Sequence, residues 1–210
     1  NPQFRRLFEA ADRILPRIGR DGDDRPDPVM VEYYDVMGYR PEAVFNALAR
    51  LGWSLDDKTE VMSRETIVAS FTLDRVVKSP AGLDTDKLAS LQGHWIGESC
   101  PDERLDRCLG YLHAAGLITD ISDEGTRTFV ASLLEAMGDR LKIYSDVLEF
   151  DEFFTSDEEL EYDQKAVSKR LAKEGVAENL AAFRDELAAT DAFDAASLES
   201  LMKGWVERQD

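Results

Sequence analysis

The sequence predicts a mostly α-helical protein, built as a multi-helix bundle of two packed helical subdomains. Apolar residues recur at the three- and four-residue spacing of amphipathic helices along most of the chain. Prolines that suit a first helical turn and glycines that suit a helix end separate these segments. Of the 210 residues, 43% are hydrophobic, which is ordinary for a protein with a buried core. We expect residues 1–28 to form a helix and a linker, followed by helical parts over 29–96 and 97–210.

In the first half of the chain, an amphipathic helix is expected to begin near Phe4 and to stop at Pro16. Residues 19–28 are polar and contain two glycines and two prolines, which is typical of a linker. Residues 29–34 favour a short β-strand. The further helices are predicted to begin at Pro41 and at Ser63 and to cover 85–91 and 103–114.

From Gly125 onward almost the whole chain is predicted to be helical. One apolar stripe contains Val176, Leu180 and Phe183, and a later one contains Leu198 and Trp205. Before them lies the acidic run 151–163, which we interpret as a solvated loop or helix face.

The residue spacing and the motifs exclude several classes of function. Neither His94 nor His113 lies at metal-ligand spacing from Cys100 or Cys108. No P-loop, G-x-G-x-x-G or G-x-S-x-G motif is present. We therefore predict no catalytic, cofactor-binding or metal site.

The cysteines need no disulfide in a chain with this much core, which favours a reducing, cytoplasmic location. No apolar run reaches the roughly 18 residues of a membrane span.

The net charge of −18 opposes binding to nucleic acid in general. A basic surface would have to be local, formed by a few cations that meet phosphates directly.

Two ordered motifs stand in the first half of the chain. Residues 38–54 read G-Y-R-P-E-A-V-F-N-A-L-A-R-L-G-W-S, and residues 71–81 read F-T-L-D-R-V-V-K-S-P-A. Both are similar to motifs of the glutamyl-tRNA synthetases, which are class I aminoacyl-tRNA synthetases. Segment 84–96 continues the resemblance, as do Arg140-Leu141-Lys142 and residues 162–166 more weakly. Arg40 departs from the usual Leu of the motif, and Gln92 from the usual Asn.

The resemblance implies a stem-contact region over residues 29–96 and the first helical anticodon-binding subdomain over 97–210. A parent enzyme of this kind attaches glutamate to tRNA with ATP, charging either glutamate tRNA alone or glutamine tRNA as well. The H-x-G-H-type and K-L-S-K-R-type signatures that hold ATP in the family are absent from this chain. We therefore predict an inactive fragment without its own cofactor, with ATP bound by the parent's catalytic domain. Its expected partners are tRNA and that catalytic domain, and neither DNA nor a membrane.

Two groups of residues are predicted to contact tRNA. They are Arg75, Lys78, Ser79 and Lys87 around the turn at Ser79-Pro80, and Lys165, Lys169, Arg170 and Lys173, whose spacing would place them on one side of a helix. The competing interpretation is that both are ordinary solvated surface charge, paired in the second group with nearby Glu.

Tyr39, Pro41, Leu48, Leu51 and Trp53 are expected to pack against the catalytic domain, so the free chain would expose an apolar patch. A different class of function is an acidic helical protein–protein module that has lost RNA binding. In that case the acidic run around Asp157 would be its interface.

Overall fold

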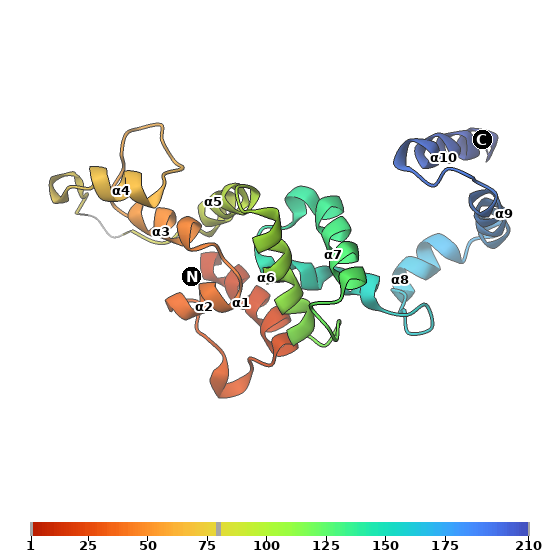
Figure 1. The fold of residues 1–210 in the computed structure, drawn as a ribbon, viewed down its shortest axis with the longest axis horizontal. Helices are drawn as coiled ribbons and strands as arrows, with labels where there is room; N and C mark the ends of the chain where they lie inside the picture. Colours follow the sequence, from red (N-terminus) through yellow and green to blue (C-terminus); the bar gives the residue numbers. More distant parts are fainter. Residues whose placement is uncertain (1, 79–80, 210) are drawn as a thin grey trace. The chain divides into compact units, whose positions relative to one another are not determined.

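The computed structural model describes residues 2–78 and 81–209, and all of its regular structure over these residues is helical (Figure 1). This confirms the predicted fold class. The chain forms two compact units, Asn1–Thr155 and Ser156–Asp210. The boundary expected near residue 97 lies inside the first unit, where one continuous core joins the residues on both sides of it.

The first unit contains seven α-helices among its described residues, with short 3-10 turns between some of them. Their bounds are α1 Pro2–Ile14, α2 Val31–Val36, α3 Pro41–Ala49, α4 Arg64–Ser70, α5 Thr85–Gly97, α6 Pro101–Ala114 and α7 Glu124–Met137. The 3-10 segment η5, Tyr144–Phe154, follows α7 and is kinked at Phe150.

Several helix starts follow from the sequence as expected. Pro41 stands in the first turn of α3, where its missing N–H has no intrahelical partner to lose. The Ser63 side chain accepts the backbone N–H of Thr66 at 3.2 Å and caps α4. Asp84 and Asp123 cap α5 and α7 in the same way.

Helix α1 belongs to the main core of the first unit. Leu7, Ala11 and Ile14 are buried together with residues of α5, α6 and α7. The Leu7 carbonyl also accepts a hydrogen bond from the Tyr33 hydroxyl at 2.9 Å. The polar segment after α1 is held down as well, by an ion pair between Arg25 and Asp12 at 2.6 Å. Residues 2–28 are therefore an integral part of this unit.

The strand predicted over residues 29–34 is wrong, because residues Val31–Val36 form the helix α2. Valine and tyrosine favour strands only where they fit a pleated, half-buried surface. Here Tyr33, Tyr34 and Met37 are all buried in the main core, and the two tyrosine rings pack edge to face with centroids 5.1 Å apart. Burial of these side chains in the main core therefore favours a helix here, although the residue types by themselves favour a strand.

The link between α2 and α3 is bonded to α6 and η5 through three consecutive carbonyls. The Val36 carbonyl accepts from the Tyr111 hydroxyl at 2.8 Å. The Met37 carbonyl accepts from the Ser145 hydroxyl at 2.7 Å, and the Gly38 carbonyl from the Tyr144 N–H at 3.1 Å. We call these three bonds the carbonyl clamp.

Arg40 extends the clamp from the first residue before α3. Its backbone N–H donates to the side-chain oxygen of the buried Gln92 at 2.9 Å. Its guanidinium donates to Glu103 at 2.6 Å and to the Tyr144 hydroxyl at 3.0 Å. Arg40 and Gln92, which both depart from the residues usual in the family, therefore bond to each other and connect α3, α5, α6 and η5.

The second unit is thinly packed. It contains α8 Gln164–Ala166, a π-helical turn over Val167–Leu171, α9 Val176–Ala188 and α10 Ala195–Gln209. The two predicted apolar stripes meet where Phe183 and Trp205 pack with ring centroids 5.3 Å apart, and Arg208 pairs with Glu186 at 2.6 Å. No described residue of this unit is fully buried.

We predict that Gly38→Ala lowers the free energy of unfolding by about 2–4 kcal/mol, from left-handed backbone strain plus overpacking. Gly38 has φ +82°, and a Cβ there would lie 2.8 Å from the Tyr111 hydroxyl and 2.9 Å from the Tyr144 Cβ. Gly116→Ala is the matched control, because φ is +72° but no atom lies within 4 Å of the added Cβ. It should cost about 1 kcal/mol, from backbone strain alone. Urea denaturation followed by circular dichroism measures both, and equal losses would contradict a role for the clamp.

Candidate nucleic-acid interface

The two motifs of the first half meet at a small second core. Trp53, Met62 and Ile67 are buried together there. The fully buried Asn46 of α3 holds the intervening loop by donating to the Glu60 carbonyl at 3.1 Å and accepting from the Met62 N–H at 2.9 Å. This amide therefore fixes the path of the chain from α3 to α4.

The segment that carries the predicted cations is tied to the end of α3. The Val77 N–H donates to the Gly52 carbonyl at 2.7 Å. This bond places Lys78 beside the Gly-Trp end of the first motif, so residues more than 20 positions apart form one corner of the protein.

Arg75 has a structural task at this corner. Its guanidinium donates to the Leu55 carbonyl and lies over the Trp53 ring, 5.9 Å from the centroid. It also faces Asp56, whose carboxyl pKa is lowered by the N–H groups of Thr59 and Lys58 and, to a smaller extent, by Arg75 itself. The Arg75 guanidinium is therefore already engaged with groups of the protein itself.

Lys78 is the more available cation. It is exposed, and within the described part of the chain it makes no ion pair. Ser79, the predicted phosphate donor, lies outside the described residues, as does Pro80.

Lys87 lies on the first turn of α5 and lines a pocket of about 200 Å³ with Arg50 and Asp84. Arg50 pairs with Glu60 at 2.8 Å and, together with a smaller effect of Lys87, lowers the pKa of that carboxyl. The pocket thus contains both signs of charge. Arg50 was not among the predicted residues, although it stands in the first motif where the family usually has Leu.

The second predicted group does not share one regular helix face. Lys165 lies in α8, whereas Lys169 and Arg170 lie in the π-helical turn and Lys173 follows its end. A π turn has a wider repeat than the α-helix on which the prediction was based. All four are exposed, and no ion pair to Glu involves them within the described residues.

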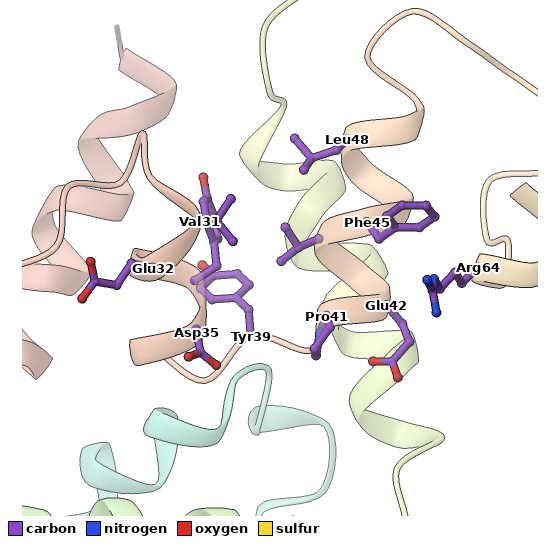
Figure 2. Close-up of a pocket in the computed structure, with 11 residues that line it drawn as sticks. Val31, Glu32, Asp35, Tyr39, Pro41, Glu42, Phe45, Leu48 and Arg64 are labelled. Atoms are coloured by element: carbon purple, nitrogen blue, oxygen red, sulfur yellow. The ribbon is translucent and has the colours of Figure 1, made fainter. Parts of the chain in front are cut away.

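An apolar groove of about 780 Å³ lies between α2 and α3 (Figure 2). Tyr39, Pro41 and Leu48 line it, as three of the five residues predicted for the exposed patch. Trp53 does not, because it is buried in the second core. Phe45 of α3, which was not predicted, also lines the pocket, and Figure 2 shows its ring on the side of α3 that faces Arg64.

Over residues 2–78 and 81–209, no three His, Cys, Asp or Glu side chains come close enough together to hold a metal ion. No helix described there is long and apolar enough to cross a membrane.

Residues 103–210 match the family model described as an anticodon binding domain. Residues 24–90 match the model of the class I tRNA synthetase catalytic domain for glutamate and glutamine enzymes. The chain is 34% identical to the glutamate–tRNA ligase of Moorella thermoacetica over 84% of its own length and 36% of that protein. The ligase of Roseiflexus castenholzii is also 34% identical, over 90% of this chain and 38% of that one. This chain belongs to the glutamyl-tRNA synthetase family.

The solved structures agree at the level of the fold. A glutamate tRNA ligase from Elizabethkingia meningosepticum superposes with a TM-score of 0.67 at 21% identity, over 84% of this chain and 33% of that one. The chain thus spans about a third of the length of its relatives. Residues 91–102 lie between the two family matches and belong to neither. A functional boundary near 97 stays a prediction, because the compact units divide elsewhere.

We predict that Asn46→Ala lowers the free energy of unfolding by about 2–4 kcal/mol, because it leaves the Met62 N–H and the Glu60 carbonyl without their partner. Limited proteolysis should show earlier cleavage within residues 55–62. Asn179→Ala on the exposed face of α9 is the control and should change stability by less than about 0.5 kcal/mol. Unchanged cleavage in Asn46→Ala would show that the loop is held by other contacts.

Proposed function

We propose that this chain is the tRNA-binding part of a glutamate–tRNA ligase, whose whole protein attaches glutamate to tRNA with ATP in protein synthesis. The main support is the match of residues 103–210 to an anticodon binding domain, next to a catalytic-domain match over 24–90. In this proposal the chain binds and positions the tRNA but contributes no reacting group. It acts in the cytoplasm.

The exposed cations of the corner must outweigh a net charge of −18 at short range. Salt screens charges beyond about 8 Å at physiological ionic strength, so distant carboxylates weigh little against a direct contact. At the corner, Asp56 accepts backbone N–H groups at 2.5 and 2.8 Å, and Glu60 is paired with Arg50. Lys78 is therefore the best placed to meet a phosphate, with Arg75 and Lys87 in support. The four cations from Lys165 to Lys173 would add contacts from the second unit.

The groove between α2 and α3 is proposed to receive another part of the catalytic domain of the same enzyme. Its lining runs from Val31 to Arg64, entirely within the stretch that matches the catalytic-domain model. Apolar surface of this kind is costly to leave in water and marks a contact site. In this proposal ATP and glutamate bind in that domain, outside the present chain.

We expect the chain to bind bulk tRNA with an affinity that falls steeply between about 50 and 200 mM salt, as phosphate contacts require. Lys78→Glu should weaken binding about tenfold at low salt and make the slope of log Kd against log salt shallower by about 1. Fluorescence anisotropy with labelled tRNA measures both.

Arg5→Glu is the control for this experiment. Arg5 is 79% exposed on α1 and lies outside both family matches, and the change in net charge is the same. Equal effects of the two variants would refute the corner as a contact site. If the chain binds no tRNA even at low salt, the proposal is wrong and the acidic protein–protein module becomes the better interpretation.

For the groove, we expect the chain to bind the catalytic domain of the ligase made as a separate chain, and Phe45→Glu to abolish this binding. Phe45 is 39% exposed, so the substitution should leave the fold intact. Val68→Glu on α4 is the control, since Val68 is 65% exposed and lies outside the groove. Isothermal titration calorimetry distinguishes them, and equal binding by both variants would exclude the groove.

A further inference from the structure

We propose a second RNA-contact surface in the first unit, formed by Arg107, Arg140 and Lys142 around Tyr144, which binds the ribose-phosphate backbone of tRNA. It rests on the proposed function, because tRNA is taken as the ligand. None of its three cations is among the residues predicted from the sequence to contact tRNA, and all three are exposed.

Arg107 is held over the ring of Tyr144, with its guanidinium carbon 5.6 Å from the centroid. Glu103 stands one helical turn earlier on α6, the usual position for an ion pair with Arg107. However, Glu103 is bound to Arg40 at 2.6 Å. Arg40 thus engages Glu103, the adjacent Asp106 is paired with Arg127 at 2.7 Å, and Arg107 makes no ion pair among the described residues.

The carboxylate nearest to Lys142 on its C-terminal side is also engaged, in this case by backbone N–H groups. Asp146, four residues later, accepts the backbone N–H groups of Lys142 at 2.7 Å and of Ile143 at 2.9 Å. Burial raises the pKa of this carboxyl, with Glu149 adding to the effect and the two N–H groups and Arg13 opposing it. The Lys142 ammonium lies instead over α5, where a Cβ on Gly93 would be 3.2 Å from Nζ.

Arg140 lies on the same strip of surface as Lys142. Leu141 and Ile143 have extended backbone conformations and are buried, while Arg140 and Lys142 are exposed. Arg140 ends a 3-10 turn and Lys142 stands between the two buried residues, so both cations lie on the exposed side of this short segment. The adjacent Asp139 is the carboxylate nearest to Arg140 in sequence, and no ion pair is formed between them.

The chemistry of this surface fits a polyanion. Arginine presents a planar fork of donors that matches phosphate oxygens, and the stack on Tyr144 limits the freedom that Arg107 loses on binding. The surface is formed by α6 and the segment after α7, within the match to the anticodon binding domain. It belongs to the same compact unit as Lys78, so one RNA can contact both surfaces.

The test is anisotropy titration of the full chain with labelled tRNA at about 50 and 200 mM salt, using Arg107→Glu, Lys142→Glu and their combination. Each single variant should weaken binding about tenfold at low salt and reduce the salt slope by about 1, and the double variant by about 2. Lys142→Arg should keep the wild-type slope, because the charge is retained. Arg5→Glu is again the control of equal charge change.

If both reversals act no more than Arg5→Glu does while Lys78→Glu still weakens binding, this surface is refuted and the proposed function stands. If the wild-type chain shows no salt-dependent binding to tRNA, both are refuted. If a reversal variant melts at a lower temperature than wild type, the same titration is repeated with Arg107→Gln and Lys142→Gln. They remove the charge without adding a carboxylate, and an unchanged salt slope in them overturns the proposal.

Discussion

The carbonyl clamp is the constraint on which the arrangement of the first unit depends. Three successive carbonyls, from Val36 to Gly38, accept hydrogen bonds from α6 and η5, and the chain can turn there because Gly38 adopts a positive φ without the cost that a side chain would bring. Because the acceptors are backbone carbonyls and one donor is the backbone N–H of Tyr144, the side chains that the clamp needs are only the hydroxyls of Tyr111 and Ser145. The clamp fixes where α3 begins, and α3 in turn carries one wall of the groove and the end at which Lys78 is held.

The same network redistributes charge. Glu103 forms an ion pair with Arg40. Asp146 accepts backbone N–H groups of its own segment, and Asp56 does the same in the loop after α3. Carboxylates that are occupied in this way are oriented toward the protein, so Arg107 and Lys142 face solvent without an ion-pair partner among the described residues. A net charge of −18 therefore does not describe each surface, because screening makes local geometry decide what an approaching phosphate meets.

Much of the fold was predictable, because proline, glycine and capping residues act through local geometry. The starts of α3 and α4 and the facing stripes of α9 and α10 are examples. The strand predicted over 29–34 failed because burial against α1 and α6 outweighed local preference. The grouping of Lys165 with Lys173 stays a prediction, and the α-helical spacing on which it was based is interrupted by a π turn. Arg75 and Lys78 were predicted from a motif, and the motif does not show that the Leu55 carbonyl and the Trp53 ring already contact Arg75.

The sequence alone determined the helical class and the family, because periodicity, caps and ordered motifs are all encoded within short stretches of chain. Only the tertiary structure decided which charges are available. Pairs such as Arg40 with Glu103, or Lys142 with the surface above Gly93, join residues about 50 or more positions apart. A carboxylate four residues from a cation looks like its partner in the sequence, yet whether it pairs depends on which donor the fold brings closer.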